Sequence, residues 1–186
     1  LQLIEKGTMG PINSEQKELI SNITESCKYI LTMISMVLNT YRYESQRNSL
    51  YYEKFDLQDI VVKSFEEISN LAKEKNIDFV YQANGDNTYL EADKEELKKV
   101  IINLLNNAVV YSAVGEKIVV KIECENNNLT FSVSSKGISL SNKECINLFE
   151  RTSEKNPKYT TVGHGISLYL CKKIIDVHNG KIFAST

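Results

Sequence analysis

A seven-residue repeat of apolar residues near the start of the chain is the feature that most restricts its fold. Apolar residues recur there at alternating steps of three and four, at Ile20, Ile23, Cys27, Ile30, Ile34, Val37 and Tyr41. Such a heptad seam is typical of a helix that packs along another helix, because it keeps one narrow stripe facing the partner. Asn13 and Gln16 have the spacing of a capping box at the helix start. We therefore expect one long helix over residues 14–44.

The partner of this helix is left open by the sequence. Residues 1–4 precede a break at Gly10 and Pro11 and fit the tail of an antiparallel helix, most of which the sequence does not include. A lone helix packed on its own domain is the alternative, but it usually shows a wider and less regular apolar stripe. We interpret residues 1–48 as a dimerisation segment that pairs two chains through helix 14–44.

The remaining residues, 49–186, alternate between strand-like and helix-like patterns. We expect strands over residues 51–57, 77–82, 88–91, 117–124, 129–133 and 181–184, and helices over 57–75, 95–111, 141–150 and 165–177. Turn residues after 82 and after 124 predict two hairpins, and polar residues 151–162 predict a mobile loop. Hairpins make the sheet mixed, so the predicted fold is α+β, a two-layer α/β sandwich preceded by the long helix.

Charge and cysteine use exclude several classes of protein. The chain has 22 Lys and Arg residues against 24 acidic residues, and this net charge of −2 argues against nucleic-acid binding. No run approaches the ~18 consecutive apolar residues of a membrane-spanning helix.

The cysteines have no metal-ligand spacing, so we expect free, buried thiols in a reducing compartment: Cys27, Cys124, Cys145 and Cys171. We expect a cytoplasmic location, with membrane contact only through parts of a longer protein.

Polar residues interrupt the otherwise apolar helix predicted over residues 95–111. Asn is a poor helix former and is unfavourable to bury without a partner. Asn103 and Asn107 are four residues apart, so both side chains project from one face, where their amide oxygens could hold a divalent cation or a polar ligand. The alternative is that these amides bond to a neighbouring strand or face water.

Two glycine-containing turns are further candidates for ligand contact. Gly163 and Gly165 lie where a polar loop becomes a helix, which suits a close approach of backbone N–H groups to phosphate. Residues 134–137, Ser-Ser-Lys-Gly, form a tight turn after a strand. Each motif taken alone also fits a plain turn.

The order of these elements resembles the sensor histidine kinases. It is similar to their second dimerisation helix followed by the ATP-binding domain of the gyrase, Hsp90, histidine kinase and MutL superfamily, over residues 1–184. Residues 97–112, LKKVIINLLNNAVVYS, closely match the Asn box of that family. Another ATPase of the superfamily is disfavoured because the heptad helix belongs to the kinase layout.

The resemblance implies an ATP and Mg²⁺ site with roles for particular residues. Asn107 matches the Mg²⁺ ligand, Asn103 its companion one turn earlier, and Tyr111 an aromatic residue near adenine. The remaining matched positions are the two lid glycines, the first glycine under the adenine, and the position of the adenine-binding carboxylate: Gly163, Gly165, Gly137 and Ser135.

Departures from the family pattern weaken this implied site. Ser135 replaces a carboxylate that accepts a hydrogen bond from adenine, and Ser139 and Ser167 replace glycines. Val110 replaces a phosphate-facing lysine. Loss of one charged hydrogen bond removes ~1.5–3 kcal/mol, which is about ten- to a hundredfold in affinity.

Two functions remain open from the sequence. The resemblance implies part of a kinase that passes a phosphoryl group to a histidine and then to a response regulator, and the departures favour a non-catalytic dimerising scaffold. The phosphoacceptor histidine of the family lies upstream of this chain, so we expect no catalytic histidine here. We expect a spacer role for His164 and a structural role for His178 at a helix end.

Overall fold

The computed structural model describes residues 4, 10–44, 50–84, 88–126, 128–150 and 164–186, and the predicted loop 151–162 lies outside them. In chain order the elements are α2 (Ser14–Glu44), β1 (Tyr52–Asp56), α3 (Leu57–Glu74), β2 (Asp78–Asn84), β3 (Tyr89–Asp93), α4 (Lys94–Tyr111), β4 (Lys117–Glu125), β5 (Asn128–Ser134), α5 (Asn142–Asn147) and α6 (His164–Val177).

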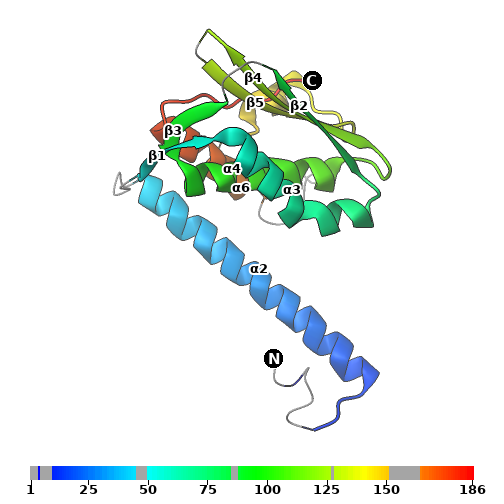
Figure 1. Ribbon diagram of the computed structural model, residues 1–186. Coiled ribbons are helices and arrows are strands. Elements are labelled where there is room, and N and C mark those ends of the chain that lie inside the picture. Colours follow the sequence, from blue (N-terminus) through cyan, green and yellow to red (C-terminus); the bar gives the residue numbers. More distant parts are fainter. Residues whose placement is uncertain (1–3, 5–9, 45–49, 85–87, 127, 151–163) are drawn as a thin grey trace.

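The main sheet has the order β2-β4-β5 and is mixed, because β2 runs parallel to β4 and β5 runs antiparallel to it. A separate antiparallel pair joins β1 to β3. Helices α3, α4 and α6 form a layer on one side of the main sheet (Figure 1). The predicted two-layer α+β sandwich with a mixed sheet is confirmed.

Apolar side chains between these layers form the core and place α4 in the middle of the helical layer. Helix α4 contacts α3 on one flank and α6 on the other. Side chains from β4 and from the helices are fully buried between them, including Ile60, Leu105, Val109, Ile118, Val120, Ile122 and Ile174. Burial on both flanks and against the sheet fixes the position of α4.

The hairpin predicted over residues 77–91 is wrong. Strand β2 pairs in parallel with β4, with Phe79 opposite Ile118, and β3 pairs instead with β1, with Phe55 opposite Leu90. These distant pairings bury Phe55 and Ala92 in the core, which a local hairpin turn signal does not predict.

The strand predicted over residues 181–184 is also absent. Residues 180–186 have no regular secondary structure, and the Phe183 side chain is 78% exposed. An extended segment becomes a strand only when a neighbouring strand bonds to it, and within the described residues none pairs with this segment.

The long N-terminal helix is confirmed as α2. Its predicted capping box is present, since Gln16 N–H donates to Asn13 Oδ1 at 2.8 Å and Asn13 N–H donates to Gln16 Oε1 at 3.0 Å. Only its last turns pack on the domain, through buried Thr40 and Tyr43 and contact with α6 (Figure 1). Most of the seam is exposed: Ile23, Ile30, Ile34, Val37 and Tyr41.

The cysteines are free, as expected, but not all are buried. Cys145 and Cys171 lie in the core, Cys124 is half-buried, and Cys27 is exposed because the α2 seam around it has no cover in one chain. Within the described residues, no helix has both the length and the apolarity needed to cross a bilayer.

Candidate functional site

The candidate site is built on the C-terminal half of α4. This helix starts at its N-cap Asp93, whose carboxylate accepts from the backbone N–H of Glu96 at 3.1 Å. Asn103, Asn107 and Tyr111 follow at steps of four, so the three side chains project from one helix face. All three are half-buried. They are fixed in place by the helix yet still reachable by a ligand.

The first of these asparagines contacts helix α6. The Asn103 side chain is hydrogen-bonded to the Cys171 thiol. Burial raises the pKa of Cys171 to about 12, although this hydrogen bond acts in the opposite direction. From the sequence we expect Cys171 only to be a free, buried thiol, and the packing of α6 on α4 brings it to Asn103. One amide of the predicted pair therefore has a protein partner.

The turn after β5 lies directly against the end of α4. Ser112 and Gly137 form an isolated antiparallel bridge, and the Ala113 N–H donates to the Lys136 carbonyl at 3.4 Å. A Cβ built on Gly137 would lie 2.0 Å from the Tyr111 carbonyl oxygen. Only glycine allows this approach, so the structure brings Gly137 against the Tyr111 backbone.

The other predicted site residues, Ser135, Gly163 and Gly165, lie outside α4 in the sequence. Ser135 follows β5 directly and is exposed. Gly165 is the second residue of α6, whereas Gly163 lies outside the described residues. The structure therefore joins α4 to the turn at 135–137, and it joins α4 to α6 through Asn103.

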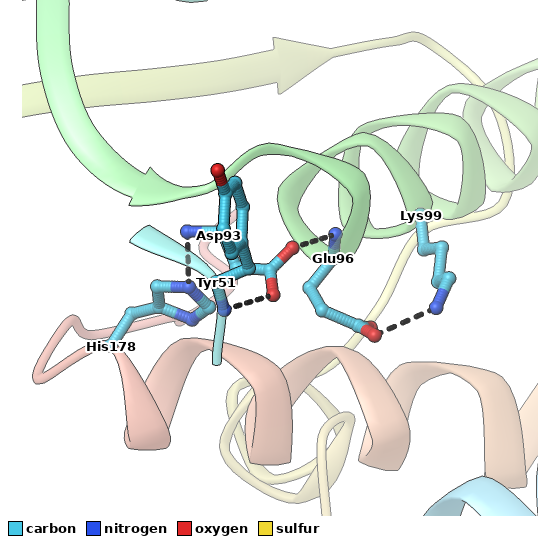
Figure 2. A network of polar contacts seen from close by, with 5 residues as sticks. All are labelled: Tyr51, Asp93, Glu96, Lys99 and His178. Atoms are coloured by element: carbon cyan, nitrogen blue, oxygen red, sulfur yellow. Dashed lines mark hydrogen bonds and ion pairs between the residues drawn. The ribbon is translucent and has the colours of Figure 1, made fainter. Parts of the chain in front are cut away.

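A second polar cluster, which sequence reasoning missed, surrounds the other end of α4 (Figure 2). Asp93 Oδ2 accepts from the Tyr51 N–H at 2.9 Å, and the Asp93 N–H donates to Nε2 of His178 at 3.0 Å. Glu96 accepts from Lys99 Nζ at 2.8 Å and bonds to the side chain of Tyr43. Burial, with help from Glu96, raises the pKa of the Tyr43 phenol. The cluster links α2, the segment before β1, α4 and α6.

The predicted structural role of His178 is confirmed by its two ring contacts. Nε2 accepts from Asp93, and Nδ1 lies 2.7 Å from the Ile174 carbonyl oxygen. The pair of contacts fits the tautomer with the proton on Nδ1.

Comparison with known families agrees with this arrangement. The family model described as "Histidine kinase-, DNA gyrase B-, and HSP90-like ATPase" matches residues 92–186, which is just over half of the chain and includes all of α4 and α6. The chain belongs to this ATPase family. The match begins one residue before the N-cap of α4, so the candidate site lies within the family domain.

Relatives of this chain include sensor histidine kinases. The circadian input-output histidine kinase CikA of Synechococcus elongatus is 25% identical over 177 residues, which are 93% of this chain and 24% of CikA. The chain thus spans about a quarter of the length of that relative.

Two solved histidine kinase structures share the fold. Full-length ShkA in complex with AMPPNP has a TM-score of 0.80 at 20% identity, covering 95% of this chain and 37% of that chain. ThkA in complex with the response regulator TrrA has a TM-score of 0.74 at 23% identity, covering 99% of this chain and 53% of that chain.

The residues that depart from the pattern of the ATPase family differ in their surroundings. Val110 is half-buried on α4, and Ser135 and Ser139 are exposed in the segment after β5. Ser167 is buried in the first turns of α6, with 5% of its surface exposed. Among the described residues, no three His, Cys, Asp or Glu side chains are grouped to hold a metal ion.

Proposed function

We propose that residues 49–186 bind ATP with Mg²⁺ as the nucleotide-binding domain of a sensor histidine kinase, and that residues 1–48 pair two chains. The observation that carries this proposal is the placement of Asn107 and Tyr111 on one face of α4, with Gly137 directly against the end of that helix. Membership of the ATPase family and the AMPPNP complex of ShkA support it.

The residues present fit a nucleotide with its metal ion. Mg²⁺ usually keeps several waters and binds phosphate oxygens together with one or two oxygens from the protein. The half-buried Asn107 amide offers one such oxygen. Tyr111 offers an aromatic ring one helix turn further along, and the Gly137 turn offers backbone groups beside it. These residues would hold the ligand and orient it.

In the proposed reaction the bound ATP supplies the γ-phosphoryl group. Phosphoryl transfer depends on alignment and on stabilisation of charge more than on covalent chemistry by the protein. Asn107 would fix the metal ion, and the turn at 135–137 and the start of α6 at Gly165 would contact the nucleotide. Both ring nitrogens of His178 are in contact with backbone groups, of Asp93 and Ile174, so His178 would not be the acceptor. The acceptor histidine would come from a helix outside this sequence.

We further propose a cytoplasmic, homodimeric parent protein that passes its phosphoryl group to a response regulator. The ThkA complex with TrrA is a precedent in a protein of this fold. The exposed apolar seam of α2 supports a second chain as its cover.

A degenerate scaffold with weak or no nucleotide binding is the second candidate. It is favoured by Ser135, which is exposed and neutral where the related kinases place a carboxylate, and by Val110, which has no charge. In this case the chain keeps the fold and the apolar seam of α2 but no longer turns over ATP.

Calorimetry with ATP and Mg²⁺ distinguishes the two candidates. We expect a dissociation constant of ~0.1 mM or weaker for the chain as it is, and at least about tenfold tighter binding after Ser135→Asp with Val110→Lys. Asn107→Ala should abolish the Mg²⁺-dependent binding, whereas Asn106→Ala, a change of the neighbouring asparagine, should preserve it. Micromolar binding by the unchanged chain would contradict the degenerate scaffold. No binding even after restoration would contradict the nucleotide site.

A further inference from the structure

Three carbonyl groups near the C-terminal end of α4 accept hydrogen bonds from Ser112 and Lys75. A helix leaves its final carbonyls without partners inside the helix, so they need partners from elsewhere. The Ala108 carbonyl accepts from the Ser112 N–H at 3.0 Å and from the Ser112 hydroxyl at 2.6 Å. The next two carbonyls, of Val109 and Val110, accept from one ammonium group, Nζ of Lys75, at 3.0 and 2.5 Å.

Lys75 is itself held firmly at the end of α3. It is the C-cap of that helix, and its backbone N–H bonds to the carbonyls of Ala72 and Lys73. Its own carbonyl accepts from the Gly115 N–H at 2.9 Å, while Nζ lies 3.4 Å from the Ser112 carbonyl oxygen. Backbone and side chain of this one residue therefore bind both the end of α4 and the segment that follows it.

This contact differs from that of an ordinary surface lysine. The side chain is partly buried, and its charge lies at the end of α4 where the helix dipole is negative, so attraction adds to the hydrogen bonds. The carbonyls it binds follow Asn107 by two and three residues. Tyr111 lies between the bound Val110 carbonyl and the bound Ser112 carbonyl.

We propose that Lys75 is a positioning residue of the nucleotide site: it fixes the end of α4 and so the placement of Asn107 and Tyr111 against the Gly137 turn. This inference rests on the proposed function for its ligand, but the clamp itself is a property of the free chain. Without the ammonium group, the carbonyls of Val109, Val110 and Ser112 lose this donor, and the last turn of α4 frays. The Asn107 amide and the Tyr111 ring then sample more positions.

The test compares Lys75→Met, which keeps the length of the side chain and removes its charge, with Lys73→Met, an exposed control in the last turn of α3. Hydrogen exchange is measured on the nucleotide-free chain at a temperature where all variants are folded. We expect the amides of residues 112–115 to exchange at least about tenfold faster in Lys75→Met and at the wild-type rate in Lys73→Met.

Calorimetry then compares ATP binding with and without Mg²⁺. If Lys75 acts by placing Asn107, Lys75→Met should reduce the gain in affinity that Mg²⁺ provides, which a general loss of stability in a folded sample would leave unchanged. Unchanged exchange at residues 112–115, or an unchanged Mg²⁺ gain, would overturn the inference. If no variant binds ATP, the proposed function fails, and the exchange result alone decides whether Lys75 fixes the end of α4.

Discussion

The backbone N–H of Asp93 donates to Nε2 of His178 at 3.0 Å, and this bond ties the residue before α4 to the C-terminal end of α6 (Figure 2). The Asp93 carboxylate at the same point caps α4 and accepts from the Tyr51 N–H. The helix that carries the candidate site is therefore fixed at its start by polar contacts with two other segments. Lys75 and the Gly137 turn contact its other end.

Replacing His178 tests the fixation at the start of α4. His178→Leu removes the acceptor of the Asp93 N–H, and we expect the free energy of unfolding to fall by about 1–3 kcal/mol. His178→Gln supplies an amide oxygen as a new acceptor and should recover part of this loss. Urea denaturation measures both, with the exposed Lys181→Met as a control. A leucine variant as stable as the wild type would show that the bond contributes nothing.

The Gly137 turn should tolerate no side chain. In Gly137→Ala the new Cβ meets the Tyr111 backbone at 2.0 Å, so the turn must move away from α4. We expect a loss of about 1–3 kcal/mol in the free energy of unfolding, together with weaker ATP binding. Gly180→Ala is the milder comparison, because its new Cβ would lie 2.9 Å from the Cγ2 methyl group of Ile175 and 3.4 Å from the nearest backbone atom, so we expect a smaller loss. Equal stability losses in the two variants would argue against a special role for the Gly137 turn.

The exposed seam of α2 predicts a dimer. Ile30 is 54% exposed in one chain, so a second chain could cover it. An unpaired charge at this position would be buried in the dimer at a large cost in free energy. Ile30→Asp should therefore shift sedimentation toward the monomer. Asn22→Asp adds the same charge to an exposed position off the seam and should leave the dimer intact. An identical sedimentation profile for the wild type and Ile30→Asp would count against pairing through this helix.

The buried thiol of Cys171 predicts a loss of stability in alkali. Burial raises its pKa from 9.0 to about 12, so the unfolded chain loses the proton first as pH rises. The contribution of the protonated thiol to the free energy of unfolding is complete below the unfolded pKa of 9.0. It is lost progressively between pH 9 and 12, by about 1–2 kcal/mol at pH 10.

Cys171→Ser isolates this contribution. Serine keeps a polar partner for Asn103 and does not titrate in this range, so other groups affect both proteins alike. Denaturant unfolding at pH 8 and pH 10 should show a smaller decrease in the free energy of unfolding for the variant. A decrease of the same size in both proteins would exclude the thiol as its source.

The sequence by itself determined the elements whose signal is local. The heptad spacing defined α2, the step of four between Asn103 and Asn107 placed both on one face of α4, and the turn after residue 124 gave the hairpin of β4 and β5. Each of these depends on the periodicity of a single segment or on one short turn, and such periodicity can be read without knowing any distant neighbour.

Only the tertiary structure decided which distant segments meet. Strand β3 pairs with β1 rather than with β2, Cys171 reaches Asn103, and Lys75 binds carbonyls more than thirty positions later in the chain. These contacts form because burial of the core between the sheet and the helices brings the segments together. The carbonyls at the end of α4, which have no partner within the helix, then accept hydrogen bonds from the Lys75 side chain beside them. The periodic pattern of a single segment does not specify contacts with distant segments, so these contacts depend on tertiary packing.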